Sequence, residues 1–328
     1  MFTDKLTDVN VCGIIYAVKI RYPIYGKARM ENKINKLKKE KNAVILAHYY
    51  TPSEVQKVAD YVGDSFYLAK AAKESTADII VFCGVRFMGE SAKILNPDKR
   101  VLMPDPRADC AMAHMVEPGL IDRMRDSYDD LAVVCYINST AELKCQSDVC
   151  VTSSNAVKIV KALQSKNIFF IPDKNLGRFV GEQVPEKNVI LNDGCCPIHV
   201  RIDPDSVIAE KEKHPMAKVL SHPECTREVL MLSDFIGSTA DIIKFAKADG
   251  SDEYIICTED GVDYRLQTDN PEKRFYYPDP RPCCADMKHN TLLSVLAVLE
   301  KENNEITVDE ETRRRALLPL ERMLELAK

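Results

Sequence analysis

The feature that most constrains the fold of this 328-residue chain is an internal repeat. The string PDPR occurs at residues 104–107 and again at 278–281, and each copy is followed by a cysteine, Cys110 or Cys284. Between the two copies, the strand-like run NVILNDGCCPIH carries a third cysteine at a comparable place, Cys196. These cysteines are 86 and 88 residues apart, so the sequence predicts three related units.

A second pattern recurs with the same period and indicates the fold of each unit. The apolar runs AVILAHYY, LAVVCYIN and KVLSHPE lead to His48, Tyr136 and His222, and a helix-like pattern such as FYLAKAAKE follows each run. Strands that alternate with helices predict parallel sheets with right-handed crossovers and helices on both faces. We therefore expect an α/β protein in which three homologous three-layer, parallel-sheet domains surround a pseudo-threefold axis and a central active-site cavity.

The expected divisions of the chain follow the repeat. They are an N-terminal extension and helix at 1–40, α/β repeats at 41–127, 128–213 and 214–300, and a C-terminal helix at 301–328. The charged segment INKLKKE within the extension is expected to be a solvated helix face. The C-terminal helix is amphipathic, and its apolar side chains are expected to pack back on the core. These side chains are Leu317, Leu318, Leu320, Met323 and Leu326.

Composition excludes several functional classes. The chain has 45 Lys and Arg against 50 Asp and Glu, so it lacks the basic surface typical of proteins that bind nucleic acid or anionic membranes. Its apolar runs are shorter than the ~20 residues that a membrane span needs. The apolar stretch at 9–20 follows Asp4 and Asp8 where a secretion signal would be cationic. We expect a cytoplasmic protein with no nucleic-acid or membrane partner.

The twelve cysteines are the most unusual part of the composition. Without a secretion signal, they are expected to be reduced thiols. Cys83, Cys135 and Cys257 lie in apolar strand-like runs and are expected to pack as small hydrophobic residues. The sequence contains no C-x-x-C motif, which argues against a thioredoxin-like redox site and against the common zinc ribbons.

The cysteines of the repeat have a different expected role. In parallel α/β sheets, functional groups collect at the carboxyl ends of strands. If the three units face one another, Cys110, Cys196 and Cys284 converge on one cavity. Three thiolates form a soft site with one open position, which favours an iron-sulfur cluster that acts as a Lewis acid in dehydration or condensation. The alternative is that these cysteines are products of duplication that pack in equivalent cores.

Polar residues at the other strand ends indicate the substrate. Ser65, Ser153 and Ser238 stand before the helix-like patterns, and any one alone would be an ordinary N-cap worth about 1 kcal/mol. Three at corresponding positions are suited to bind anionic groups, so the expected substrate carries several negative charges. His222 and Glu224 lie two residues apart on one side of a strand end, where they are suited to proton transfer.

Between Ala43 and Leu299 the motifs together resemble the quinolinate synthase A family of NAD biosynthesis. The matching strings are LAHYY, GDS, FCGVRFMGESAKILNP, CYINSTAELK, TSSN, IPDKNLGRFV, CPIH, SHPEC, IGST, TEDG and CADMKHNTLLSVL. The resemblance implies condensation of iminoaspartate with dihydroxyacetone phosphate to quinolinate, with release of phosphate and water. It also implies a 4Fe-4S cluster bound by three cysteines. It leaves open whether L-aspartate oxidase contacts the chain transiently when it supplies iminoaspartate.

The resemblance also assigns site residues, position by position. The implied cluster ligands are Cys110, Cys196 and Cys284, with Cys195 and Cys283 as alternatives to the last two. Cys284 is favoured because the repeat aligns it with Cys110, and Cys196 because it lies three residues before His199. The implied catalytic residues are His48, Tyr50, Tyr136, His222 and Glu224. The implied substrate-binding residues are Ser65, Asn138, Ser153, His199, Ser238 and Thr239.

Two other hypotheses are compatible with the same pattern. An aconitase-like hydro-lyase acting on a di- or tricarboxylate would share the open iron and would need no phosphate, so turnover with dihydroxyacetone phosphate separates it from a quinolinate synthase. A non-catalytic binding module built from three α/β repeats would contain no iron or sulfide after anaerobic purification.

Overall fold

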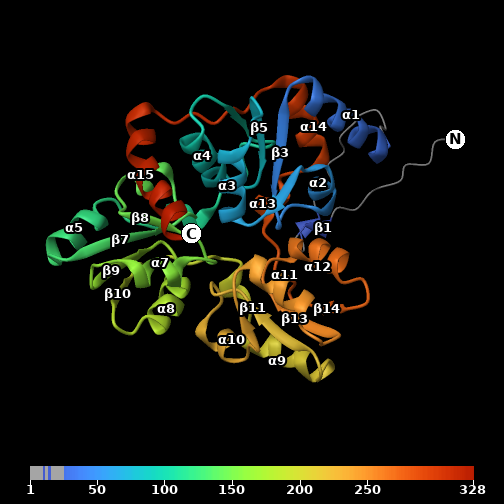
Figure 1. The fold of residues 1–328 in the computed structure, drawn as a ribbon. Coiled ribbons are helices and arrows are strands. Elements are labelled where there is room, and N and C mark those ends of the chain that lie inside the picture. Colours follow the sequence, from blue (N-terminus) through green and yellow to red (C-terminus); the bar gives the residue numbers. More distant parts are fainter. Residues whose placement is uncertain (1–9, 12–13, 16–25) are drawn as a thin grey trace.

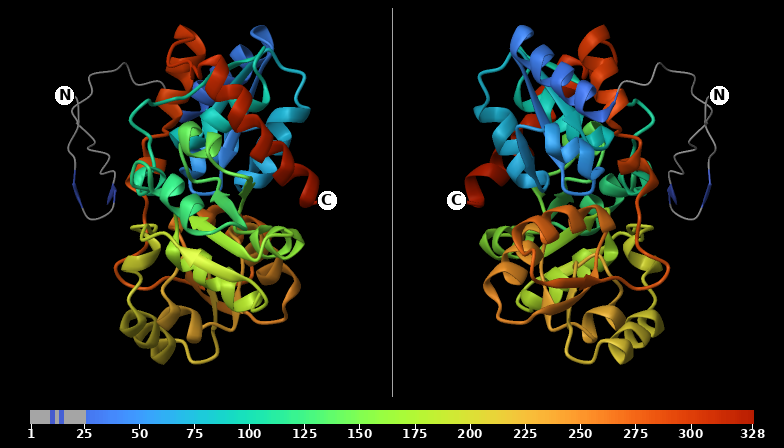
Figure 2. Two further views of the ribbon diagram at one scale, coloured as in Figure 1. Left: turned by 90° about the vertical axis from the view of Figure 1, so that its left-hand side faces the viewer. Right: turned by 90° about the vertical axis from the view of Figure 1, so that its right-hand side faces the viewer.

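The computed structural model of the chain describes residues 10–11, 14–15 and 26–328 (Figure 1). Its N-terminal part contains two short antiparallel strands, β1 (Asn10–Val11) and β2 (Ile14–Ile15). The remainder of the apolar stretch at 9–20 lies outside the described residues. From residue 26 onwards the chain forms three units that occupy separate parts of the molecule, coloured blue to teal, green, and yellow to orange (Figures 1 and 2).

Each unit is built on a four-stranded sheet in which all neighbouring strands are parallel. The strands are β3 (Ala43–His48), β4 (Tyr61–Gly63), β5 (Ile79–Cys83) and β6 (Arg100–Leu102); β7 (Leu131–Tyr136), β8 (Val149–Val151), β9 (Asn167–Ile171) and β10 (Asn188–Leu191); β11 (Lys218–Ser221), β12 (Phe235–Ile236), β13 (Glu253–Cys257) and β14 (Arg274–Tyr276). The spatial orders are β4-β3-β5-β6, β8-β7-β9-β10 and β12-β11-β13-β14. Within each unit, the second strand therefore lies at the edge beside the first, which confirms the expected α/β repeat.

Helices connect the strands and cover both faces of each sheet (Figure 1). Those up to the end of the first sheet are α1 (Lys27–Glu40), α2 (Ser53–Val58), α3 (Ser65–Glu74) and α4 (Arg86–Leu95). Those that follow are the 3₁₀ helix η1 (Ala111–His114), α5 (Leu120–Ser127), α6 (Ala141–Cys145), α7 (Ala156–Ala162), α8 (Lys174–Gln183), η2 (His199–Arg201) and α9 (Pro204–Lys213). The last are α10 (Arg227–Met231), α11 (Thr239–Ala248), η3 (Asp260–Val262), α12 (Asp263–Asp269), α13 (Ala285–Lys288), α14 (Leu292–Lys301) and α15 (Glu310–Leu326).

The central strands are apolar because helices bury them on both sides. All five residues of β5, with the sequence IIVFC, are buried. Near-continuous apolar strands are typical of parallel sheets that lie between two helical layers. Cys83, Cys135 and Cys257 are fully buried in these strands, so the expectation that they pack as hydrophobic residues is confirmed.

The last two helices join units that are distant in sequence. Although it follows the third sheet, α14 packs on the first unit, where Leu296 and Leu299 share an apolar cluster with Ile34 and Ile45. Residues 292–300 therefore lie with the first unit in space, whereas the expected division assigned them to the third. Ile34 is fully buried there, so the α1 segment expected to be solvated also has an apolar contact face.

The C-terminal helix α15 packs back on the core as expected. Leu320 and Met323 are fully buried and belong to the apolar cluster that runs through the first two units. Leu318 is 68% exposed, so its expected packing is wrong. The buried positions between residues 316 and 323 include Ala316 and Pro319, which lie on the same helix face as Leu320 and Met323.

Among the helices that the structure describes, none is both long enough and apolar enough to cross a membrane. A cytoplasmic location stays a prediction.

Candidate active site

A cavity lies among the three units, at the carboxyl ends of their strands. Nearly all the site residues expected from the sequence line it. They are His48, Tyr50, Ser65, Cys110, Tyr136, Asn138, Ser153, Cys196, His199, His222, Glu224, Thr239 and Cys284. Because each sheet contributes residues that follow its strands, the cavity exists only when all three units are assembled.

Strand register shows which residues at the helix starts occupy corresponding positions in the three units. Gly63 pairs with His48 in the first sheet, and Val151 pairs with Tyr136 in the second. In the third sheet Ser221 pairs with Ile236, so Gly237 is opposite His222. Two residues beyond each of these second-strand positions are Ser65, Ser153 and Thr239, and all three line the cavity.

Ser238 corresponds by this register to Asp64 and Thr152, and it is absent from the cavity lining. Its hydroxyl oxygen accepts a hydrogen bond from the Asp241 N–H over 3.2 Å, while the Asp241 carboxylate accepts from Ser238. This reciprocal arrangement is a capping box at the start of α11. The structure therefore places Ser238 in a helix cap and Thr239 at the cavity.

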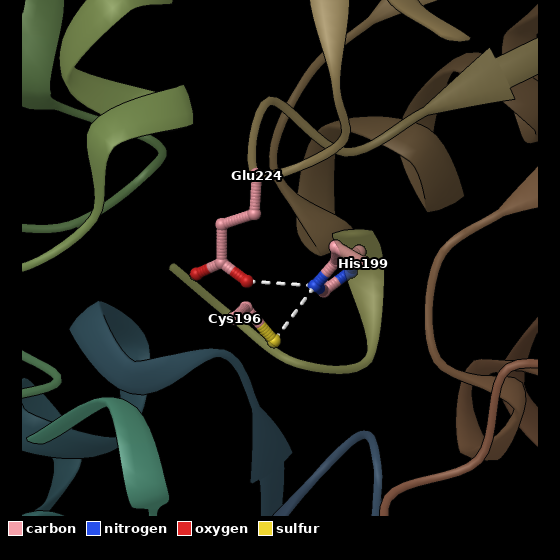
Figure 3. A group of neighbouring side chains, drawn as sticks. All are labelled: Cys196, His199 and Glu224. Carbon is pink, nitrogen blue, oxygen red and sulfur yellow. Dashed lines mark hydrogen bonds and ion pairs between the residues drawn. The ribbon is translucent and has the colours of Figure 1, made fainter. Parts of the chain in front are cut away.

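Cys196, His199 and Glu224 form a compact polar group in the cavity, and their side chains point toward one another (Figure 3). Nδ1 of His199 lies 2.7 Å from a Glu224 carboxylate oxygen and 3.2 Å from the Cys196 sulfur. His222 stacks on the His199 ring and lies 3.8 Å from Glu224. The Glu224 carboxylate is therefore closer to His199 than to His222, the partner considered in the sequence.

A chain of hydrogen bonds extends from this group to Tyr50. Nε2 of His199 lies 2.9 Å from the Thr258 hydroxyl, which lies 2.8 Å from the Tyr50 hydroxyl. The Tyr50 hydroxyl also lies 2.7 Å from the Thr239 hydroxyl. Tyr50 from the first unit, His199 from the second and residues of the third unit thus form a continuous path between Tyr50 and Glu224 along which protons can move.

The surroundings of the two ends of this path favour opposite protonation states. Burial raises the pKa of Tyr50 well above its usual value, so its hydroxyl remains protonated. Burial alone would raise the pKa of Glu224, but His199 and His222 outweigh that effect and lower it. Burial also lowers the pKa of His222 to about 3. A protonated tyrosine and an ionised carboxylate therefore face the same cavity, as an acid and a base would.

The three repeat cysteines each stand just before a short helix that borders the cavity. Cys110 precedes η1, Cys196 precedes η2, and Cys284 precedes α13. Burial raises the pKa of each thiol, and the neighbouring cysteines add to this effect, Cys284 on Cys110 and Cys110 on Cys196. Cys195 and Cys283 do not line the cavity. The cavity therefore brings together the three sulfurs that the repeat predicts.

Comparison with known proteins identifies the relatives of this chain. Residues 32–325 match the family described as Quinolinate synthetase A protein. The chain belongs to this family. A quinolinate synthase of Fusobacterium nucleatum is 52% identical over 298 residues, which cover 91% of this chain and 99% of that protein. A quinolinate synthase of Clostridioides difficile is 48% identical over 295 residues, covering 90% of this chain and 97% of that protein.

The residues at the cavity fit the iron-sulfur cluster implied by the quinolinate synthase family. Three thiols from three units line one cavity, which is the donor set of a cluster with one open iron. The side-chain oxygen of Asn138 is buried and has no hydrogen-bond partner, so a polar group remains to be satisfied there.

Several residues that face the quinolinate synthase cavity were not selected from the sequence. They are Asp64, Thr152, Glu259, Asp286 and the apolar residues Val85, Phe87, Met88, Met112 and Met287. Thr258, a member of the hydrogen-bonded path, was also missed. Thr258 and Glu259 belong to the string TEDG, which directly follows a strand-like run. Their place at a strand end was the available signal, because the same reasoning selected His48 and His222.

Gly261 offers a test of the contact between the first and third units. A Cβ atom at Gly261 would lie 2.6 Å from the main chain of Tyr50. Gly261→Ala is therefore expected to move Tyr50 away from Thr239 and Thr258, at a cost of about 1–3 kcal/mol in unfolding free energy. Denaturant unfolding and steady-state kinetics measure the two effects. In the matched control Gly250→Ala, the added methyl group meets nothing within 4 Å, and both properties should remain those of the wild type.

Proposed function

We propose that this chain is a quinolinate synthase that condenses iminoaspartate with dihydroxyacetone phosphate to form quinolinate, phosphate and water. The observation that carries the proposal is the single cavity in which residues from all three units supply thiols, hydroxyl groups and an acid-base pair. The reaction rearranges bonds without net oxidation, so it needs dehydration and proton transfer and no electron acceptor. The relatives named above bear the same description.

Cys110, Cys196 and Cys284 would hold the 4Fe-4S cluster in this proposal. When bound, the cluster supplies a Lewis-acidic iron with an open position for a substrate hydroxyl or carboxylate. The protein itself provides the remaining groups. The unsatisfied oxygen of Asn138 accepts a hydrogen bond from a substrate hydroxyl or nitrogen, which orients the substrate in the cavity.

Hydroxyl groups bind the anionic parts of the two substrates. Ser65, Ser153 and Thr239 occupy corresponding positions in the three units and face one cavity. Their hydroxyls can each donate a hydrogen bond to a carboxylate or phosphate oxygen, and such bonds to charged groups contribute about 1.5–3 kcal/mol. Three donors from three directions match substrates that together carry two carboxylates and one phosphate.

Proton transfer is assigned to the path between Tyr50 and Glu224. Condensation requires removal of a proton from a substrate carbon, and dehydration requires a proton on the departing oxygen. The ionised Glu224 accepts the first, and the neutral Tyr50 donates the second. Thr258 and His199 link the two groups, so the proton taken by Glu224 can return to Tyr50 after each turnover. His48 and His222 remain neutral, because burial lowers the pKa of each to about 3.

Ser153 and Ser238 provide a paired test of the substrate-binding assignment. Ser153→Ala removes a hydroxyl from the cavity and is expected to raise the KM of an anionic substrate by about tenfold or more, since the lost bond is worth about 1.5–3 kcal/mol. Ser238→Ala removes a helix cap and is expected to cost about 1 kcal/mol of stability with little effect on KM. Kinetics and urea unfolding of both variants separate the two roles. Equal KM effects would contradict the assignment by register.

The proposed activity is tested by anaerobic reconstitution with iron and sulfide and by chromatographic detection of quinolinate. Iminoaspartate is generated in place from oxaloacetate and ammonia. Quinolinate should form only when dihydroxyacetone phosphate is also present. Hydration or dehydration of citrate or malate, without quinolinate formation, would instead support the aconitase-like alternative. Supplying iminoaspartate from L-aspartate oxidase tests the transient contact, which stays a hypothesis: direct transfer would resist a scavenger of free iminoaspartate.

A further inference from the structure

Two buried carboxylates occupy corresponding positions beside the cysteines of the second and third units. Asp173 is the second residue after β9, and Glu259 is the second residue after β13. Both side chains are almost completely buried. In the first unit the corresponding residue is Val85, so the feature belongs to two of the three repeats.

Each carboxylate binds the main chain of the adjacent cysteine. One oxygen of Asp173 accepts a hydrogen bond from the Cys196 N–H over 2.9 Å. One oxygen of Glu259 accepts from the Cys284 N–H over 3.0 Å. The first unit differs here as well, because the N–H of its cysteine, Cys110, donates to the half-buried carboxylate of the adjacent Asp109.

The second oxygen of each carboxylate holds the turn from which that residue projects. In Asp173 this oxygen accepts from the Leu176 N–H over 2.7 Å, which caps α8. In Glu259 it accepts from the Gly261 N–H over 2.7 Å. The same two-sided arrangement at two repeats indicates that the carboxylates fix the cysteine turns to the strand ends.

Lys288 adds a further connection in the third unit. Its side chain is 14% exposed, and its ammonium group lies 2.7 Å from the Glu259 carboxylate and 2.9 Å from Asp260. The same group donates a hydrogen bond over 2.8 Å to the main-chain oxygen of Tyr50, which belongs to the first unit. A continuous series of polar contacts therefore runs from Cys284 through Glu259 and Lys288 to Tyr50.

We propose that Glu259 and Lys288 form a positioning pair that fixes the Cys284 turn relative to Tyr50. The inference rests on the proposed function, in which Cys284 holds the cluster and Tyr50 donates a proton. Neither member of the pair needs to react. Their role is to hold the turn that carries Cys284 at a fixed distance from Tyr50. Residues that support a metal ligand or a catalytic acid in this way determine how precisely that group is placed.

The ionic character of the pair gives it a property that an apolar contact would lack. Lys288 contacts two carboxylates of the third unit and one carbonyl of the first at once, so a single charge links the two units. Removing only one member would leave a buried charge without its partner, which destabilises a protein strongly. A useful test therefore removes both charges together.

The principal variant is Glu259→Gln combined with Lys288→Met. The glutamine oxygen can still accept from the Cys284 N–H, but the glutamine nitrogen cannot accept from the Gly261 N–H, and the contact of Lys288 with the Tyr50 carbonyl is lost. Arg281 remains beside Asp260 at 3.3 Å and continues to neutralise it. The matched control is Glu210→Gln with Lys213→Met, which removes an ion pair with one exposed member on α9. A conservative variant, Lys288→Arg, retains the charge and the donor.

The measurements are iron and sulfide content, the rate of cluster loss to a chelator under anaerobic conditions, and kcat separately from KM. In the principal variant we expect cluster loss to be about 10- to 100-fold faster and kcat to be lower by a similar factor, with KM little changed. The Glu210 and Lys213 control should match the wild type. Lys288→Arg should keep the rate of cluster loss and kcat close to those of the wild type. If replacement of Lys288 acted only through a general loss of stability, these two properties would not be kept.

Two results would overturn the inference in distinguishable ways. A reconstituted wild type that holds no iron would remove the proposed function and the inference with it. A wild type that holds the cluster, together with a principal variant whose rate of cluster loss and kcat are unchanged, would remove the inference alone. If the principal variant does not fold, Glu259→Asp serves instead: it keeps the charge but is too short to reach both Cys284 and Lys288, and it should also lose the cluster faster than the wild type.

Discussion

Replacement of Tyr50 by phenylalanine is expected to lower kcat by about 10²- to 10⁴-fold, the usual contribution of a positioned acid or base. The ring of Tyr50 lies edge-on to His48, with ring centroids 4.5 Å apart, and phenylalanine preserves that contact. The variant loses only the hydroxyl that bonds to Thr239 and Thr258. Iron content and the unfolding midpoint should therefore stay near those of the wild type while kcat falls.

Two further variants locate the effect. Tyr49→Phe removes the hydroxyl of the adjacent tyrosine, which does not line the cavity, and is expected to leave kcat unchanged. Thr258→Val removes the hydroxyl that joins Tyr50 to His199 and should lower kcat without removing the acid itself. If Tyr50→Phe retained wild-type kcat, another group would have to donate the proton, and the assigned path would be incorrect.

The architecture could be predicted from the repeat because the sequence pattern of one α/β unit occurs three times. Each copy contains the same order of strand, turn and helix, and the shared strand order of the three sheets follows from that. The convergence of Cys110, Cys196 and Cys284 was also predictable, because parallel strands carry their carboxyl ends to one edge of a sheet. Local spacing and one topological rule were sufficient for these features.

The correspondence among the hydroxyl residues required more than spacing. A serine occurs in the relevant turn of every unit, so matching by residue type selected Ser238 beside Ser65 and Ser153. The register of β11 with β12 moves the equivalent position to Thr239. A shift of one residue reverses the direction of a side chain in an extended segment, and residue type gives no signal for it when a serine and a threonine are adjacent. Only the family resemblance implied a substrate-binding role for Thr239 as well as for Ser238.

The partners of Glu224 and Tyr50 could not be predicted for a different reason. His222 is close to Glu224 in sequence, whereas His199 belongs to a separate turn and comes within 2.7 Å only after the units assemble. Lys288 reaches the Tyr50 carbonyl across the boundary between two units. Contacts of this kind depend on the relative placement of the units, about which the pattern within one unit contains no information.

Replacement of Cys110, Cys196 or Cys284 by serine is expected to abolish the cluster and to lower quinolinate formation by about 10³-fold, since Lewis-acid stabilisation supplies several kcal/mol. A hydroxyl has nearly the shape of a thiol but is a poor ligand for iron in such clusters. Among the described residues, no cysteine other than these three lines the cavity, and Cys195 and Cys283 lie outside its lining. Iron and sulfide analysis, optical spectra and quinolinate assays under anaerobic conditions measure the loss.

Cys195→Ser and Cys283→Ser are the matched controls, because each alters the residue beside a proposed ligand while leaving the cavity lining intact. Both should retain wild-type iron content and activity. Loss of iron in Cys195→Ser together with its retention in Cys196→Ser would show that Cys195 is the ligand in place of Cys196. That result would also require the η2 turn to rearrange, since the Cys196 sulfur is the one held 3.2 Å from His199 and its N–H the one bound by Asp173. The position of the second thiol is thus tied to the acid-base group, and the same experiment tests both.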